Sequence, residues 1–100
     1  MTQDELEQKI SKLLKKESAW LQELYDASTK YGFNFNRAND QYGSLFRAYR
    51  DLHCREICEK SADDVHDADV ELYLAIMVMS QEEAVKNMKK HYFVERTGGN

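Results

Sequence analysis

The sequence predicts an all-α protein, because three independent features agree. The 100 residues contain no proline and only four glycines, so few positions can interrupt a helix. Apolar residues recur at three- and four-residue spacing through most of the chain. The pattern of a helix N-cap, Ser or Thr followed by acidic residues, occurs at Thr2, Ser61 and Ser80. We therefore expect a small four-helix bundle that forms a single domain over 1–100.

The first helix is expected near 3–30. Thr2 and Glu5 have the spacing of a capping box, and Gly32 can adopt the left-handed conformation that ends a helix. A helix of this length spans about 42 Å, which is long for a chain of this size. The apolar stripe weakens near Glu17, so the helix is expected either to bend there or to extend into a partner. The stripe comprises Leu6, Ile10, Leu13, Leu14, Trp20, Leu21 and Leu24.

The second helix is expected near 38–60, with Asn36 or Asp40 as its N-cap. Its apolar stripe includes Tyr42, Leu45, Phe46, Tyr49, Leu52 and Ile57. The preceding loop contains Phe33 and Phe35, which we expect to close one end of the core.

Two further helices are expected near 62–79 and 81–93, because an N-cap signal precedes each of them. A frayed tail is expected over 94–100. The segment 70–79 is apolar at nine of its ten positions. A helix that is apolar on all sides is normally buried on all sides, so this segment is either the centre of the bundle or a surface covered in a dimer. Its β-branched and aromatic residues also leave a strand as an alternative.

The acidic residues of the third helix form the main candidate for a binding surface. The segment 61–79 contains five acidic residues and no basic residue, whereas charge is nearly balanced elsewhere in the chain. Carboxylates in a first helical turn are stabilised by the helix dipole, but like charges four residues apart repel each other. The predicted partner-binding residues are Asp63, Asp64, Asp67, Asp69 and Glu71. The alternatives are a solvated face, internal pairing with lysines of the first or last helix, and a cation site.

Possible metal ligands gather in the middle of the chain, but their spacing is not that of a known type of site. The residues considered are His53, Cys54, Cys58, His66, Asp63 and Asp67. A structural zinc site needs four ligands and commonly uses a Cys-x-x-Cys loop, which this sequence lacks. We expect the cysteines to pack as small apolar residues. No metal, no cofactor and no catalytic residue is therefore predicted.

Overall charge and hydropathy narrow the classes of function. The net charge of −4 and the missing basic stripe argue against direct binding of nucleic acid. The longest apolar run has about ten residues, too few to cross a bilayer. Residues 1–20 lack the apolar core of a signal peptide, so a reducing, cytoplasmic location is expected.

These observations predict a non-enzymatic protein-binding module, of the adaptor, immunity-protein or inhibitor type. Its partner would be a protein with a basic surface, for example a nucleic-acid-binding protein, steered by the acidic residues. The first alternative is a self-associating scaffold or sensor that forms a homodimer. The second is a helical module that binds a divalent metal at His66 and its neighbouring aspartates.

Overall fold

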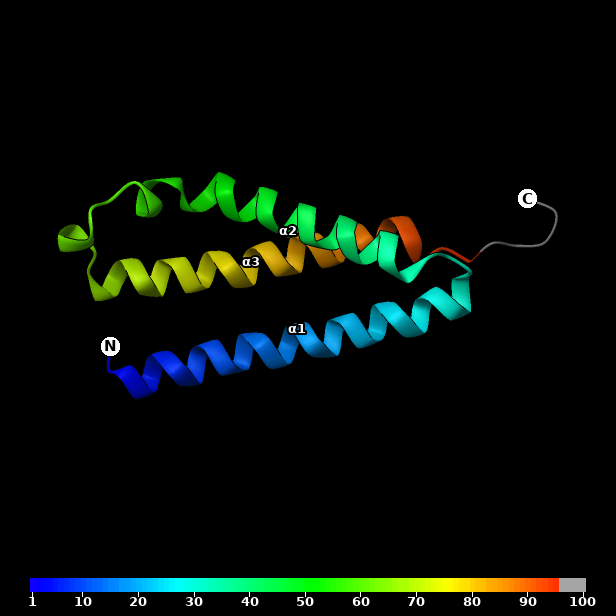
Figure 1. The fold of residues 1–100 in the computed structure, drawn as a ribbon, viewed down its shortest axis with the longest axis horizontal. Coiled ribbons are helices and arrows are strands. Elements are labelled where there is room, and N and C mark those ends of the chain that lie inside the picture. Colours follow the sequence, from blue (N-terminus) through cyan, green and yellow to red (C-terminus); the bar gives the residue numbers. More distant parts are fainter. Residues whose placement is uncertain (96–100) are drawn as a thin grey trace.

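The computed structural model describes residues 1–95, which form three long α-helices and one short 3₁₀ turn. In Figure 1, α1 and α3 run in the same direction and α2 runs opposite to them. The all-α prediction is confirmed, but the four-helix prediction is wrong, since the described residues contain three α-helices. The elements are α1 (Gln3–Tyr31), α2 (Phe35–Cys58), the turn Ala62–Asp64 and α3 (Asp67–Tyr92).

The expected helices at 62–79 and 81–93 are one continuous helix, because Ser80 does not act as an N-cap. Ser80 is fully buried, and its hydroxyl donates a 2.7 Å hydrogen bond to the carbonyl oxygen of Ile76 within the helix. No glycine or proline interrupts the helix in this region, so there is no helix end at Ser80 for its side chain to cap. After α3, Val94 and Glu95 are not helical, and the rest of the predicted tail lies outside the described residues.

The start of α3 also differs from the prediction. The Ser61 signal produces the 3₁₀ turn Ala62–Asp64, in which the amide of Asp64 donates to the carbonyl oxygen of Ser61. The α-helix itself begins at Asp67, where the carboxylate of Asp69 accepts a 2.9 Å hydrogen bond from the backbone amide of His66. A carboxylate that returns to the cap amide stabilises the first turn.

The beginning of α2 lies closer to α1 than predicted. Asn34 is its N-cap, and its side-chain oxygen accepts a 2.9 Å hydrogen bond from the amide of Arg37. The expected caps Asn36 and Asp40 therefore lie inside the helix. Phe35 is the first helical residue rather than part of a loop.

The predicted boundaries of α1 are confirmed, and the helix continues without a break through Glu17. The amide of Glu5 donates to the hydroxyl of Thr2 at 3.2 Å, and the Glu5 carboxylate returns to the Thr2 amide. At the other end Gly32 has φ of 73°, the left-handed conformation expected of a C-cap glycine. Glu17 accepts a 3.0 Å hydrogen bond from the side-chain amide of Gln81, which accounts for the polar position in the apolar stripe.

The hydrophobic core lies at the end of the molecule where α1 joins α2 and where α3 ends. We call this end, residues 17–47 and 79–95, the packed half. Its buried cluster consists of Leu24, Ala38, Tyr42, Ala84 and Met88. The rings of Phe33 and Tyr92 pack in a tilted arrangement with their centroids 4.8 Å apart, as expected for an aromatic closure of the core. Burial, followed by the negative charge of Glu17, raises the pKa of Tyr42 from its ordinary 10 to about 12.

The other end of the molecule, residues 1–16 and 48–78, has much less buried apolar surface, and we call it the open half. Figure 1 shows α1 and α2 diverging toward this end, with α3 between them. Cys54 and Ile76 are the only buried apolar residues of this half within the described chain. The exposed large apolar side chains of this half are Ile10, Leu14, Leu52, Val65 and Leu72.

The apolar segment 70–79 is not buried on all sides, so the prediction that it forms the centre of a bundle is wrong for the single chain. Ile76 is buried, but Leu72 is 53% exposed and Ala75 is also exposed. With only two neighbouring helices, which diverge here, α3 has a side that nothing in the described chain covers. The strand alternative is likewise excluded, because the whole segment is helical.

Candidate protein-binding surface

The five predicted acidic residues lie at the connection between α2 and α3 and in the first two turns of α3. They do not form one free acidic surface, because several of them bind cationic groups of the same chain. Asp69 is the most buried of the five, with a side chain 13% exposed. Its carboxylate accepts hydrogen bonds from the Lys60 ammonium at 2.6 Å and from the amide of His66. These two contacts, in that order, lower the pKa of Asp69 below 3.8.

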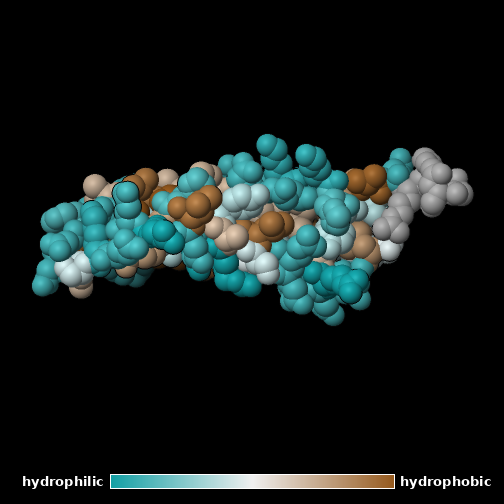
Figure 2. Space-filling view, turned by 90° about the horizontal axis from the view of Figure 1, so that it is seen from above, coloured by the Kyte–Doolittle hydropathy of each residue, from teal (hydrophilic) through white to brown (hydrophobic). Residues whose placement is uncertain are grey.

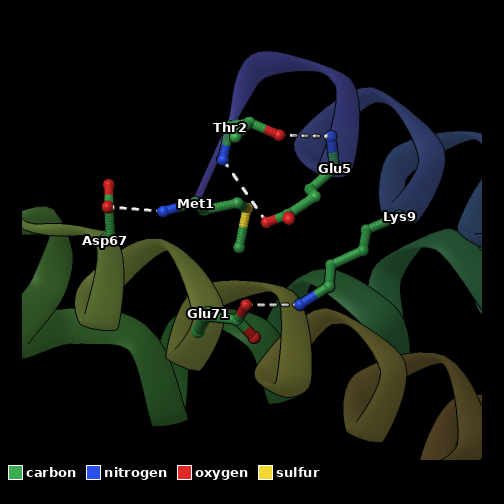
Figure 3. Close-up of polar contacts among 6 residues, drawn as sticks. All are labelled: Met1, Thr2, Glu5, Lys9, Asp67 and Glu71. Atoms are coloured by element: carbon green, nitrogen blue, oxygen red, sulfur yellow. Dashed lines mark hydrogen bonds and ion pairs between the residues drawn. The ribbon is translucent and has the colours of Figure 1, made fainter.

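Asp67 and Glu71 connect α3 to the beginning of α1, as Figure 3 shows. The N-terminal amino group of Met1 lies 2.5 Å from the carboxylate of Asp67, and this hydrogen bond lowers the pKa of that carboxyl. The ammonium of Lys9 pairs with the carboxylate of Glu71. These pairs offset the repulsion between two like charges four residues apart. Internal pairing was one of the alternatives that the sequence left open.

Asp63 and Asp64 lie in the 3₁₀ turn and are both exposed. Asp64 accepts a 2.7 Å hydrogen bond from the hydroxyl of Ser61. Neither carboxylate forms an ion pair with a described residue of the chain. Of the predicted acidic surface, these two residues therefore keep their charge free for a partner.

A second candidate surface, which the sequence did not single out, is an apolar groove between α1 and α3 in the open half. The groove has a volume of about 360 Å³. Its floor is formed by half-buried or exposed apolar side chains, and three lysines lie along its α1 rim. The lining residues are Lys9, Lys12, Leu13, Lys16, Glu71, Leu74, Ala75 and Val78.

Ion pairs cross from α1 to α3 at two points along this groove. Lys9 pairs with Glu71, and the ammonium of Lys16 lies 3.3 Å from the carboxylate of Glu82. Lys12 lies between them and pairs with no carboxylate in the described part of the chain. Glu71 and Glu82 therefore balance two of the three lysines of the lining, and Lys12 leaves a net charge of +1. The groove is apolar in its floor and positive along one rim.

Apolar side chains also reach the surface outside the groove. Leu14 is 61% exposed and Leu52 is 71% exposed. Figure 2 shows apolar patches that interrupt an otherwise hydrophilic surface. The signal for this exposure was present in the sequence, since a segment that is apolar in every direction needs more neighbours than a short chain can supply.

The two cysteines lie four residues apart in the last turns of α2, with their sulfur atoms 3.6 Å apart. Cys54 is buried and Cys58 is exposed. Burial, followed by the contact with Cys58, raises the pKa of the Cys54 thiol, which disfavours the thiolate form that binds metals. Within residues 1–95 no three His, Cys, Asp or Glu side chains converge to hold a metal ion. Neither His53 nor His66 joins the cysteines in such a cluster.

No protein-family model matches the chain, and no curated protein or solved structure is significantly similar to it. Among the described helices, none is both long and apolar enough to cross a membrane. The surface itself therefore provides the argument for function.

Proposed function

We propose that this protein is a non-enzymatic protein-binding module that acts through the apolar surface of its open half. The observation that carries the proposal is the exposure of apolar residues in 70–79, together with Ile10, Leu14 and Leu52, at one end of the molecule. Single exposed leucines are common on protein surfaces, but several exposed apolar residues at the end of the molecule that also contains an apolar groove are typical of an interaction site.

The energetic argument follows from the exposed fractions of these side chains. Complete burial of a leucine stabilises a protein or a complex by roughly 1.5–3 kcal/mol relative to full exposure. Leu14, Leu52 and Leu72 are each more than half exposed, so a partner that covers them recovers a large part of this free energy. The packed half offers less, since its exposed large apolar residues are Tyr25 and Val94.

Self-association is the second candidate, and the specific observation in its favour is the uncovered side of α3. A second copy that packs against Leu72 would bury the apolar side chains of 70–79 that the single chain leaves exposed. Two-fold symmetric dimers with such isologous interfaces are the commonest oligomers of soluble proteins.

The exposed carboxylates of Asp63 and Asp64 support the hypothesis, drawn from the sequence, that acidic residues attract a basic partner. Asp63 and Asp64 are exposed at the α2–α3 connection, which belongs to the open half. Free carboxylates at the edge of an interface raise the rate of association with a basic partner more than they raise its final affinity. We propose that they orient a partner with basic residues near its contact surface.

The test compares the same polar substitution at two apolar positions that are equally exposed. Leu72 in the open half and Val94 in the packed half are both 53% exposed. Tagged wild type, Leu72→Gln and Val94→Gln are purified from the native host, and the associated proteins are quantified by mass spectrometry. We expect a partner that Leu72→Gln loses and Val94→Gln retains.

Sedimentation of the same three purified proteins separates the two candidates. A wild-type dimer that Leu72→Gln converts to a monomer, with no other partner recovered, would favour self-association. A partner retained equally by both variants would contradict the proposed surface.

A further inference from the structure

The groove between α1 and α3 has features that define the chemistry of its occupant. We propose that it binds an amphipathic α-helix with acidic side chains, supplied by a partner protein. This inference rests on the proposed function, because it names the kind of partner that the open half binds. The main evidence for the inference is the apolar floor of the groove, which lies beside a row of three lysines. Only two of these lysines form ion pairs within the described chain.

The shape of the groove suits a helix. It lies between two helices that run in the same direction, and the side chains of Leu13, Leu74 and Val78 form its apolar floor. The small exposed side chain of Ala75 lets another backbone approach closely at the centre of the groove. A third helix that packs its apolar stripe between two others is a common form of peptide recognition.

The charge of the groove selects an acidic helix over a basic one. Lys9, Lys12 and Lys16 follow a helical spacing of three and four residues, so they lie along one side of α1. Two of them are already paired with Glu71 and Glu82, whereas Lys12 remains available between these pairs. An acidic side chain beside the apolar stripe of an incoming helix would pair with Lys12, while a basic side chain there would be repelled.

The same charges argue against a second copy as the occupant. Two grooves placed face to face would bring the lysine rows of both copies into one interface, where like charges oppose association. The exposed apolar residues outside the groove, such as Leu72, do not carry this restriction. Self-association and occupation of the groove are therefore separable by experiment.

The experiment measures binding of defined peptides to the 100-residue chain by fluorescence anisotropy. The probe is a labelled 18-residue helical peptide with leucines at three- and four-residue spacing and glutamates on its remaining positions. The control probe has lysine in place of every glutamate. We expect the glutamate peptide to bind at least about tenfold more tightly, and its affinity to fall as salt is raised.

Variants of the chain then locate the binding site. Lys12→Glu is expected to weaken binding of the glutamate peptide roughly three- to tenfold. Lys15→Glu is the matched control, because Lys15 is an exposed lysine of α1 that does not line the groove. Ala75→Trp fills the groove and should abolish binding, whereas Ala68→Trp places the same side chain at an exposed position of α3 outside it.

Three results would overturn the inference. The first is equal or tighter binding of the lysine peptide, and the second is equal effects of Lys12→Glu and Lys15→Glu. The third is a wild-type dimer that Ala75→Trp dissociates, which would make a second copy the occupant. None of these results alters the outcome for Leu72→Gln in the proposed-function test, so failure of this inference is distinguishable from failure of the proposed function.

Discussion

The two halves of this molecule use the same three helices but hold them together by different means. In the packed half, Leu24 and Met88 are fully buried and aromatic rings close the end of the core. In the open half, half-exposed ion pairs such as Lys9 with Glu71 connect α1 to α3 beside partly buried apolar side chains. The difference arises because α1 and α2 diverge, so side chains that would meet in a bundle core are left on the surface (Figure 1). Buried and exposed apolar surface are thus concentrated at opposite ends.

The contacts in the two halves contribute different amounts of stabilising free energy. Burial of a large apolar side chain contributes roughly 1.5–3 kcal/mol, whereas an exposed ion pair contributes at most about 1 kcal/mol. The ion pairs of the open half therefore contribute less than the buried side chains of the packed half, and apolar side chains of the open half stay exposed.

The largest expected effect distinguishes two leucines of the same helix. Leu24→Ala should lower the free energy of unfolding by about 2–5 kcal/mol, because the side chain is completely buried and leaves a cavity. Leu14→Ala should change it by less than about 0.5 kcal/mol, since Leu14 is 61% exposed. Urea unfolding of both variants provides the measurement. Similar losses at the two positions would show that the open half is as well packed as the other.

The next largest expected change in stability comes from enlarging one of two alanines on α3. Ala84→Leu should destabilise the protein by about 1–3 kcal/mol, because Ala84 is fully buried and the added carbons have no space. Ala75→Leu should be nearly neutral, since Ala75 lies in the open groove. Thermal unfolding followed by circular dichroism measures both. A marked loss of stability for Ala75→Leu would contradict the presence of an open groove.

The pH dependence of stability tests the connection between α2 and α3. Because the pKa of Asp69 is lower in the folded protein than its ordinary 3.8, its pairing with Lys60 stabilises the fold above that pH. This contribution is lost as the pH falls below about 4 and through the folded-state pKa. Asp69→Asn should therefore lose less stability than wild type on acidification.

The matched control for this measurement is Asp63→Asn, which removes the same charge from an exposed carboxylate of the same segment. Its stability should fall with pH as steeply as that of wild type. Chemical unfolding at pH 7, 5, 4 and 3 provides the comparison. Identical pH profiles for Asp69→Asn and Asp63→Asn would exclude a special role for the Lys60 pair.

The smallest expected effect concerns the ion pair of α1 and α3. In a double-mutant cycle, Lys9→Ala and Glu71→Ala should give a coupling energy of about 0.2–1 kcal/mol, because both side chains are about half exposed. Raising the salt concentration should reduce the coupling further. A coupling well above this range, unaffected by salt, would mean that the open half is held as firmly as the packed half.

Much of the local structure was predictable from short patterns. The capping box of Thr2 and the left-handed Gly32 gave the ends of α1, because both depend only on neighbouring backbone groups. The same type of signal was misleading at Ser80, where the hydroxyl bonds inside a continuous helix. A serine offers either arrangement locally, and the packing around it decides between them.

The candidate site was predictable only in part. The acidic residues were identified from composition, but their pairing with Lys9 and Lys60 depends on contacts between helices far apart in the sequence. The groove was missed because its two walls come from residues 9–16 and 71–78. The excess of apolar residues in 70–79 was the one sequence signal that pointed to it.

The sequence alone determined that this chain is helical, where its first helix begins and ends, and that it contains more apolar surface than a short chain readily buries. These properties follow from propensity, capping and composition, which act over a few residues. Only the tertiary structure decided which surface stays exposed. That choice depends on the divergence of α1 and α2 around α3, and therefore on the free energy of packing among residues distant in the sequence.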